Sequence, residues 1–315
     1  MKVLITGVAG FAGSHLLDFL KTKDTQVAGV VYNPSHAKVL GDSLANLKIF
    51  AGDLNNPKFV NRIIRDFKPD HIYHLAAQAS AAVSFLDPET TILGNIKSQL
   101  NILESVRNYN LNPKILIVGS AEEYGLVAKK DLPITEDTNL RPIQPYAVSK
   151  IAQDYLGYQY HLSYGLNVVR VRPFNYIGPR QRTDFVVADF SSQVAEIAVG
   201  KKEPVVRVGN IEAKRDFTDV RDMVEAFYLS LEKGENGEVY NLGSGKSYAI
   251  SWILDELIKI SKVKIKVEVE KKRLRPVDIP ETICDSSKFR SRTGWEPKID
   301  INKTLQDTLD YFLSK

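Results

Sequence analysis

The first thirteen residues contain the feature that most restricts the fold of this chain. The apolar run Lys2–Thr6 ends at Gly7, and Gly10 and Gly13 follow at regular intervals. In a strand–turn–helix unit, the first glycine permits a tight turn, the second admits a pyrophosphate, and the third allows close helix–strand contact. The helix expected from Phe11 then offers free N–H groups to an anion. The pattern predicts a parallel α/β sheet with a dinucleotide site at its first turn.

Apolar runs typical of strands alternate with segments of helical periodicity through the first 173 residues. The predicted strands are Lys2–Thr6, Gln26–Val31, Lys48–Ala51, His71–Ala76, Lys114–Gly119 and Asn167–Arg172. The predicted helices between them are Phe11–Lys23, Pro57–Phe67, Pro88–Tyr109 and Tyr146–Tyr164. This order predicts an α/β fold built on a doubly wound parallel sheet of the Rossmann type.

After Pro173 the alternation weakens, which indicates a second, smaller domain. Val220–Leu231 and Val239–Leu242 still resemble one more helix and strand of the sheet. We therefore expect a dinucleotide-binding domain at 1–173 plus about 215–245, and a C-terminal substrate domain at about 174–214 plus 246–315. In the latter, Val263–Val269 alternates apolar and charged residues, which predicts a half-exposed strand with a charged outer face.

Composition excludes several other classes. The 42 basic and 38 acidic residues leave a net charge of +4, which argues against a nucleic-acid-binding protein. The single cysteine, Cys284, cannot form an internal disulfide and fits the reducing cytoplasm. No apolar segment approaches the length of a membrane span, and the five histidines show no metal-binding spacing. We expect a cytoplasmic protein with no metal, nucleic-acid or membrane partner.

Tyr146 and Lys150 lie one turn apart at the start of a predicted helix and therefore share a face. A tyrosine needs its pKa lowered by about 3 units to exchange protons near neutrality, roughly 4 kcal/mol. One ammonium about 4 Å away supplies a comparable sum. Ser120 follows the strand Lys114–Gly119, at the edge where open α/β folds meet ligands. The three residues are predicted to form an acid/base site, with Tyr146 and Lys150 as its proton-exchanging pair.

Several motifs together resemble the extended short-chain dehydrogenase/reductases of the nucleotide-sugar branch, and the resemblance covers almost the whole chain. The motifs are Gly7/Gly10/Gly13, Gly52-Asp53-Leu54, His74-Leu75-Ala76-Ala77-Gln78, Ser120, Tyr146/Lys150, and Arg172-Pro173-Phe174-Asn175 with Gly178-Pro179. The resemblance implies that Ser120 and Tyr146 hold the sugar oxygen and that Lys150 holds the nicotinamide ribose.

The same resemblance implies NADP or NAD as the cofactor. The implied cofactor-binding residues are Gly7, Gly10, Phe11, Ala12, Gly13, Tyr32, Asn33, Asp53, Leu54, Leu75, Ala76, Ala77, Tyr146, Lys150 and Pro173. An acid at the end of the second strand indicates NAD and an arginine indicates NADP. Tyr32 and Asn33 stand there instead, so both cofactors remain open.

Within this branch, four segments look most like the enzymes that act on GDP-mannose and its derivatives. They are residues 79–85, 120–125, 209–216 and 274–280. The implied substrate-binding residues are Ser80, Ser84, Ser120, Glu122, Asn175, Arg215, Arg275 and Asp278. Arginines suit the diphosphate because they are fixed, always-charged donors.

The resemblance implies two competing reactions. A reductase would deliver hydride from NAD(P)H to the C4 ketone of GDP-4-keto-6-deoxy-D-mannose, with Tyr146 protonating the oxygen, and yield GDP-D-rhamnose. A GDP-mannose 4,6-dehydratase would oxidise C4, remove the C5 proton, expel water from C6 and then return the hydride, with Glu122 as an additional catalytic base. We expect the reductase because the chain is short for a dehydratase, Ser120 replaces a typical threonine, and residues 141–145 lack the usual aromatic stretch.

Other activities remain as alternatives. An epimerase or a reductase of a different nucleotide sugar would use the same acid/base pair. A cofactor-sensing regulator without catalysis is the non-enzyme alternative, although the chain retains both Tyr146 and Lys150.

Two long helices contain more apolar residues than one sheet face requires. These residues are Leu93, Ile96, Leu100 and Leu103 in the first helix, and Ile151, Tyr155, Tyr158 and Leu162 in the second. The resemblance implies that the two helices pair across a two-fold axis in a homodimer, whereas packing on the sheet is the alternative.

Overall fold

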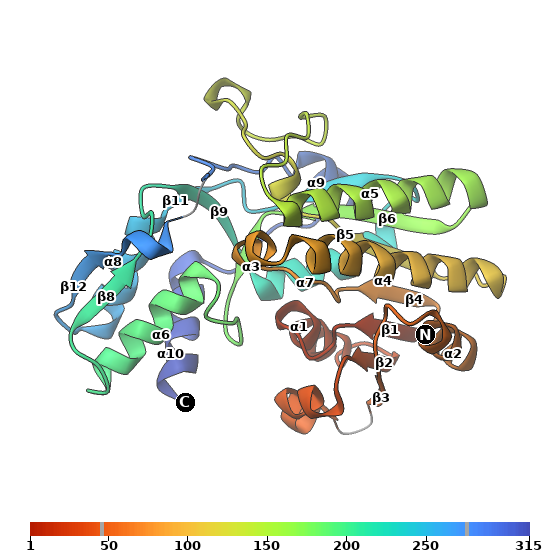
Figure 1. Cartoon of the computed structure of the whole chain (residues 1–315), viewed down its shortest axis with the longest axis horizontal. Helices are drawn as coiled ribbons and strands as arrows, with labels where there is room; N and C mark the ends of the chain where they lie inside the picture. Colours follow the sequence, from red (N-terminus) through yellow and green to blue (C-terminus); the bar gives the residue numbers. More distant parts are fainter. Residues whose placement is uncertain (45–46, 275–276) are drawn as a thin grey trace.

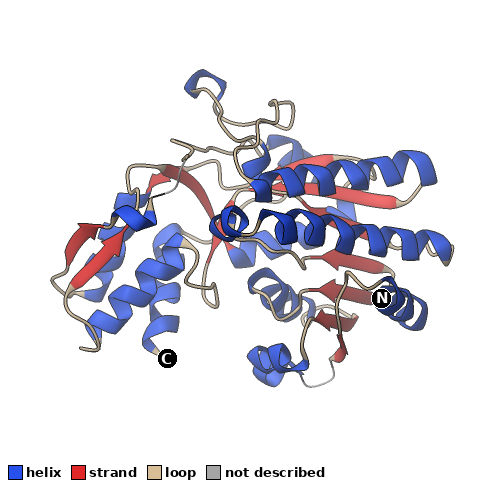
Figure 2. Cartoon of the chain, in the orientation of Figure 1, coloured by secondary structure: helices blue, strands red, loops and turns tan. Residues whose placement is uncertain are grey.

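The protein was analysed as a computed structural model, in which residues 1–44, 47–274 and 277–315 are described. A seven-stranded sheet lies in its larger part (Figures 1 and 2). The strand order is β10 (Val239–Leu242), β6 (Asn167–Pro173), β5 (Lys114–Val118), β4 (His71–His74), β1 (Lys2–Thr6), β2 (Gln26–Val31) and β3 (Lys48–Ala51). Every neighbouring pair is parallel. The predicted parallel Rossmann-type sheet is confirmed.

Helices cover both faces of this sheet. One face carries α1 (Phe11–Leu20) and α7 (Val220–Lys233), and the other carries α2 (Pro57–Phe67), α4 (Pro88–Asn108) and α5 (Pro145–Tyr164). The sheet strands are apolar on both sides because each face is buried under helices. His71 and Tyr73 of β4 face the α7 side, whereas Ile72 faces the α2 and α4 side. The sheet is therefore doubly wound, as predicted.

The remaining elements share a separate core. A three-stranded sheet contains β11 (Ser247–Ala249), β9 (Lys214–Asp219) and β7 (Asn175–Ile177), and a two-stranded sheet pairs β12 (Lys266–Val269) with β8 (Val205–Val208). The helices α6 (Val186–Ala198), α8 (Ile250–Ser261) and α10 (Ile301–Leu313) pack around that core. Figure 1 shows these helices with β8 and β12 gathered to one side of the large sheet. Shorter helices are α3 (Ala81–Leu86), α9 (Ser287–Thr293) and the 3-10 segments η1 (Pro34–Leu44), η2 (Ala121–Glu123), η3 (Lys129–Asp131) and η4 (Lys271–Arg273).

The strand predicted at Val263–Val269 is shorter than expected, and its valines are exposed to solvent. Only Lys266–Val269 forms β12, and its valines Val267 and Val269 are 36% and 63% exposed. Val263 and Ile265 pack instead on the core under α8. The prediction of one buried apolar face was wrong for β12, because this strand belongs to a two-stranded sheet at the molecular edge.

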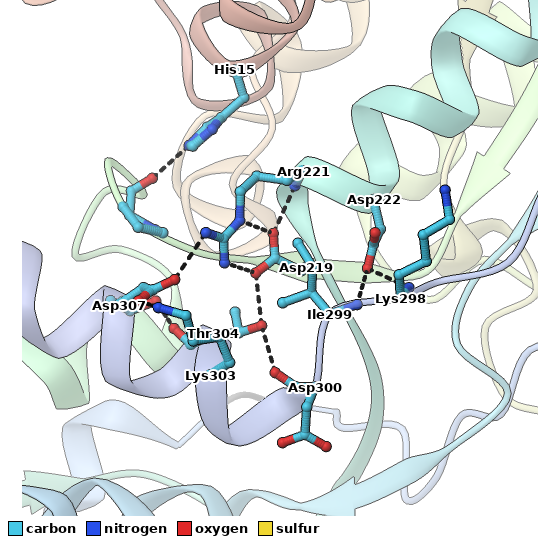
Figure 3. Close-up of polar contacts among 12 residues, drawn as sticks. His15, Asp219, Arg221, Asp222, Lys298, Ile299, Asp300, Lys303, Thr304 and Asp307 are labelled. Carbon is cyan, nitrogen blue, oxygen red and sulfur yellow. Dashed lines mark hydrogen bonds and ion pairs between the residues drawn. The ribbon is translucent and has the colours of Figure 1, made fainter.

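Two sets of polar contacts join the smaller group of elements to the large sheet (Figure 3). Arg221, at the start of α7, bonds the Asp219 carboxylate at 2.7 Å and the Asp307 carboxylate of α10 at 2.8 Å. His15 of α1 bonds the carbonyl of Pro179, beyond β7, at 2.9 Å. Each contact links a helix of the large sheet to a segment of the smaller group. None of the described helices is long and apolar enough to cross a membrane.

Candidate active site

The glycine positions of the turn between β1 and α1 and of the first turn of α1 have no room for side chains. Gly7 has a φ of +69°, and a Cβ there would lie 2.9 Å from the backbone nitrogen of Ala76. A Cβ on Gly13 would lie 2.2 Å from the carbonyl oxygen of Gly7. Gly10 is the N-cap residue of α1, and it has no side chain that could accept a hydrogen bond from the first N–H groups of the helix. The first N–H groups of α1 therefore remain available to an anion, which fits the pyrophosphate of a dinucleotide.

The other residues predicted to bind the cofactor gather at the same edge of the sheet. Thr6 Oγ1 accepts hydrogen bonds from the backbone N–H groups of Leu75 and Ala76, both at 3.1 Å, so the ends of β1 and β4 are held together. At the end of β2, the Tyr32 side chain is 71% exposed. Asn33 accepts a hydrogen bond from the Ser35 backbone at 3.0 Å. Neither side chain distinguishes NADP from NAD.

A hollow follows the end of β3. It is lined by Gly52, Asp53, Asn56, Lys58, Phe59 and Arg62. Asp53 accepts a hydrogen bond from the backbone of Asn55 at 2.8 Å, and Leu54 is buried in the core under α2. The hollow lies beside the end of β2, because the backbone N–H of Gly52 donates to the carbonyl of Val31.

Tyr146 and Lys150 lie over the end of β5. Pro145 begins α5, so both side chains come from the first two turns of that helix. Lys150 Nζ donates a hydrogen bond to the carbonyl of Val118 at 2.8 Å and lies 5.8 Å from the centre of the Tyr146 ring. The Tyr146 hydroxyl is hydrogen-bonded to Ser120. The structure thus brings the three predicted acid/base residues together.

Burial dominates the proton affinities of this pair. It raises the pKa of the Tyr146 phenol well above its ordinary value, and the hydrogen bond to Ser120 opposes the shift. Burial lowers the pKa of Lys150 to about 8, and the nearby carboxyl of Glu123 opposes that shift. The expectation that Lys150 would lower the pKa of Tyr146 was wrong for the chain by itself. Desolvation of the phenolate outweighs the ammonium, which is directed to the Val118 carbonyl.

Glu122 lies beside the same group. Its carboxylate accepts a hydrogen bond from the Gln144 amide at 2.5 Å, and its backbone N–H donates to Ser120 Oγ at 3.2 Å. Gln144 is buried and immediately precedes α5. Glu122 is therefore near Tyr146, as the motif predicted, but its carboxylate is already engaged by an amide.

A buried charge cluster behind these residues was not predicted. Arg172 of β6 pairs with Asp154 at 2.5 Å and with Glu123 at 3.1 Å, and Arg170 pairs with Asp154 at 2.7 Å. Two signals in the sequence indicate these partners. Ser120 and Glu123 have the spacing of a capping box, and Asp154 follows Lys150 by one helical turn.

The predicted substrate-binding residues fall in several places. Arg215 of β9 bonds Asp278 at 2.7 Å, so these two are together. Asn175 begins β7, two residues after Pro173, which ends β6, and Ser80 precedes α3. Ser84 is fully buried in α3 and donates its hydroxyl to the Ala81 carbonyl, so it is not presented to a ligand. Arg275 lies outside the described residues.

A parallel sheet with this glycine turn and with serine, tyrosine and lysine over its fifth strand defines a short-chain dehydrogenase/reductase of the extended type. The comparison with family models is more specific. Residues 4–308 match the family described as GDP-mannose 4,6 dehydratase, and the chain belongs to that family.

Individual relatives include both reductases and dehydratases. A "GDP-6-deoxy-D-mannose reductase" from Pseudomonas aeruginosa is 32% identical over all of this chain and 98% of its own length. A "GDP-mannose 4,6 dehydratase 1" from Arabidopsis thaliana is 31% identical over 98% of this chain and 88% of its own length. The solved structure of RMD from Pseudomonas aeruginosa complexed with NADPH superposes with a TM-score of 0.88, at 31% identity and 99% coverage of both chains.

Proposed function

We propose that this protein reduces the C4 ketone of GDP-4-keto-6-deoxy-D-mannose to GDP-D-rhamnose, with NADPH or NADH as the reductant. The observation that carries the proposal is the buried Tyr146 phenol, kept protonated and hydrogen-bonded to Ser120 at the end of β5. The full-length similarity to a Pseudomonas aeruginosa protein named as a GDP-6-deoxy-D-mannose reductase supports the choice of substrate.

The chain supplies the proton and the positioning for this reaction. Tyr146 donates its phenolic proton to the C4 oxygen, and the Ser120 hydroxyl bonds the same oxygen as charge develops on it. A reduced nicotinamide, when bound, would supply the hydride that turns the C4 ketone into a secondary alcohol. Lys150 would hold the nicotinamide ribose, and its ammonium would stabilise the phenolate left on Tyr146.

The comparison of lengths favours reduction over the dehydratase reaction. The relative named as a reductase is matched over 98% of its own length, whereas the relative named as a dehydratase is matched over 88%. The dehydratase reaction also needs a second base, and Glu122, the candidate for it, accepts a hydrogen bond from Gln144. The dehydratase is the second candidate, favoured by the family match and by the presence of Glu122 beside Tyr146.

The reductase and dehydratase reactions can be distinguished by the substrate that the protein accepts. Incubation with GDP-mannose and no added reduced cofactor is expected to leave the sugar unchanged, because C4 carries no ketone to reduce. Addition of GDP-4-keto-6-deoxy-D-mannose with NADPH or NADH is expected to consume the cofactor and form GDP-D-rhamnose. Chromatography of the nucleotide sugars measures both. Efficient conversion of GDP-mannose to its 4-keto-6-deoxy product would replace the reductase by the dehydratase.

We also propose that the two groups of elements are the cofactor-binding and sugar-nucleotide-binding domains expected at 1–173 plus about 215–245, and at about 174–214 plus 246–315. The glycine turn and the end of β5 support the first assignment, and the pairing of Arg215 with Asp278 supports the second. A cytoplasmic location is proposed because Cys284 is a free, buried thiol.

A homodimer through α4 and α5 is part of the proposal. Leu93 on α4, and Tyr155 and Leu162 on α5, are 57%, 53% and 63% exposed, although these helices already cover the sheet. Exposed apolar side chains on neighbouring helices favour a self-complementary interface.

Light scattering at micromolar concentration is expected to give the mass of a dimer. Tyr155→Glu combined with Leu162→Glu is expected to give a monomer, because two charges would be buried in the interface. Val199→Glu, at a residue 51% exposed after α6, is the matched control and is expected to stay dimeric. A monomeric wild-type protein would exclude this interface.

A further inference from the structure

The hollow at the end of β3 carries two cationic side chains. Lys58 lies in the first turn of α2, and Arg62 follows it by four residues, so both side chains leave the same face of the helix. Both residues line the hollow and are exposed. The two positive charges therefore face one shallow space beside the end of β2.

Neither cation is paired with a carboxylate in the part of the chain that the structure describes. The Arg62 guanidinium lies 5.4 Å from the centre of the Phe59 ring, which holds it by its face rather than by an opposite charge. Arg65, on the same helix, differs because it pairs with Asp66 at 2.8 Å. Lys58 and Arg62 are thus available to a negatively charged ligand.

The two cations are unfavourable for α2 by itself. The helix dipole places partial positive charge at the N-terminus, and the first turn, which contains Lys58, has no acidic residue. Arg62 adds a like charge four residues later, which is also unfavourable. Asp53 supplies one carboxylate to the lining, and that carboxylate accepts a hydrogen bond from the backbone of Asn55. Positive charge therefore exceeds negative charge around the hollow, and a bound anion would offset the repulsion.

The hollow lies toward the adenosine end of the expected dinucleotide site. The strands follow one another in the order β1, β2, β3, and the glycine turn that fits the pyrophosphate comes directly after β1. In folds of this class the adenosine ribose is recognised at the end of the second strand. Tyr32 and Asn33 stand there and provide no charge. The neighbouring charges that could recognise a phosphate on that ribose are those of Lys58 and Arg62.

We propose that Lys58 and Arg62 bind the adenosine 2′-phosphate and make this protein select NADPH over NADH. A phosphate monoester carries a charge of about −1.5 to −2 near neutral pH, and it suits an arginine fork together with an ammonium. This inference rests on the dinucleotide site of the proposed function, but not on the sugar or on the direction of the reaction.

The direct test measures binding of two adenosine fragments by isothermal titration calorimetry, with no sugar and no redox step. Adenosine 2′,5′-bisphosphate and adenosine 5′-monophosphate differ only in the 2′-phosphate. The wild-type protein is expected to bind the bisphosphate at least about tenfold more tightly at about 50 mM salt. This ratio of affinities is expected to fall at about 0.5 M salt, because exposed charges are then screened. Equal affinities at low salt overturn the proposal.

Substitutions then assign the ratio to the two cations. Lys58→Gln and Arg62→Gln are each expected to lower the ratio about threefold or more, and the double variant is expected to bring it close to 1. Affinity for the monophosphate is expected to stay within about twofold of wild type, because the 5′-phosphate belongs to the glycine turn. Equal losses for both fragments indicate contacts with the adenine or a change of fold, and they overturn the proposal.

Two further variants serve as controls. Arg65→Gln removes an exposed arginine of the same helix that is paired with Asp66, and it is expected to keep the wild-type ratio. Arg62→Lys keeps the charge and loses the planar fork, so its ratio is expected to lie between those of wild type and Arg62→Gln. If the double variant does not fold, the single variants decide, and an unchanged ratio in both overturns the proposal.

Kinetics separate this inference from the proposed function. With GDP-4-keto-6-deoxy-D-mannose as substrate, kcat/KM is expected to favour NADPH in the wild type, and the double variant is expected to lose that preference with little change for NADH. Equal use of NADH and NADPH by the wild type overturns the inference and leaves the reductase activity standing. If the ketone is not reduced but the fragments bind as described, the proposed function fails and the roles of Lys58 and Arg62 are supported.

Discussion

Replacing Tyr146 with phenylalanine is expected to lower kcat about 1,000-fold, which corresponds to roughly 4 kcal/mol of lost transition-state stabilisation. The substitution removes the proton that the C4 oxygen receives and leaves the ring in its buried position between α5 and the end of β5. Cofactor affinity is expected to change little, because the pyrophosphate would be held at the distant glycine turn. Oxidation of NADPH in single turnovers measures the first effect, and cofactor titration measures the second.

Tyr311→Phe is the matched control for that experiment. Tyr311 and Lys315 repeat the spacing of Tyr146 and Lys150 at the end of α10, where the ammonium lies 4.3 Å from the ring centre. This pair is remote from β5, and its loss is expected to leave kcat within about twofold of wild type, as for other substitutions away from the chemistry. Full activity in Tyr146→Phe would remove the tyrosine from the mechanism.

Replacing Arg172 with methionine is expected to cost about 3–5 kcal/mol of the free energy of unfolding. The guanidinium is 4% exposed and pairs with both Glu123 and Asp154, so its removal leaves two buried acidic side chains with only Arg170 beside one of them. Arg207→Met breaks an exposed pair with Glu203 and is the control, expected to cost at most about 1 kcal/mol. Urea unfolding of the three proteins measures these differences.

The cost of Arg172→Met is expected to depend on pH. The folded-state pKa of Glu123 is about 8, which lies above the value of about 4.3 for an unfolded glutamate. Between these two pH values the folded protein therefore holds a proton that the unfolded chain has lost. This contribution to stability is present below about pH 4 and is lost as pH rises through about 8. Arg172 lowers that pKa, so in the variant the loss continues to higher pH. The gap between variant and wild type should therefore widen from pH 7 to pH 9, and a constant gap would contradict the charge-cluster explanation.

The sequence predicted most of the fold because its strongest patterns are local. All six predicted sheet strands of the first 173 residues were found, with ends shifted by at most two residues, as at His71–His74. Burial on both faces gives such strands continuous apolar runs. The prediction failed at Val263–Val269, because an alternation of apolar and charged residues does not reveal whether another element packs on the apolar face of the strand.

The site was predicted only as far as its residues lie in recognisable motifs. Ser120, Tyr146 and Lys150 were brought together as expected. The direction of the Tyr146 pKa shift was not predictable from spacing, because it depends on how completely the phenol is buried. The contact between Gln144 and Glu122 joins residues 22 positions apart and leaves no periodic signal.

The last strand of the large sheet arrives late in the chain. β10 lies beside β6, but residues that build β7, α6, β8 and β9 are translated between them. When Pro173 leaves the ribosome, β6 has β5 as its partner on one side, and its other edge stays open until Val239–Leu242 has been made. A gene fragment that stops at Pro173, where the alternation of strands and helices weakens, would encode an incomplete sheet with an exposed, aggregation-prone edge strand. Grafting the unit that contains the large sheet onto another protein therefore requires α7 and β10 to be carried along with the first 173 residues.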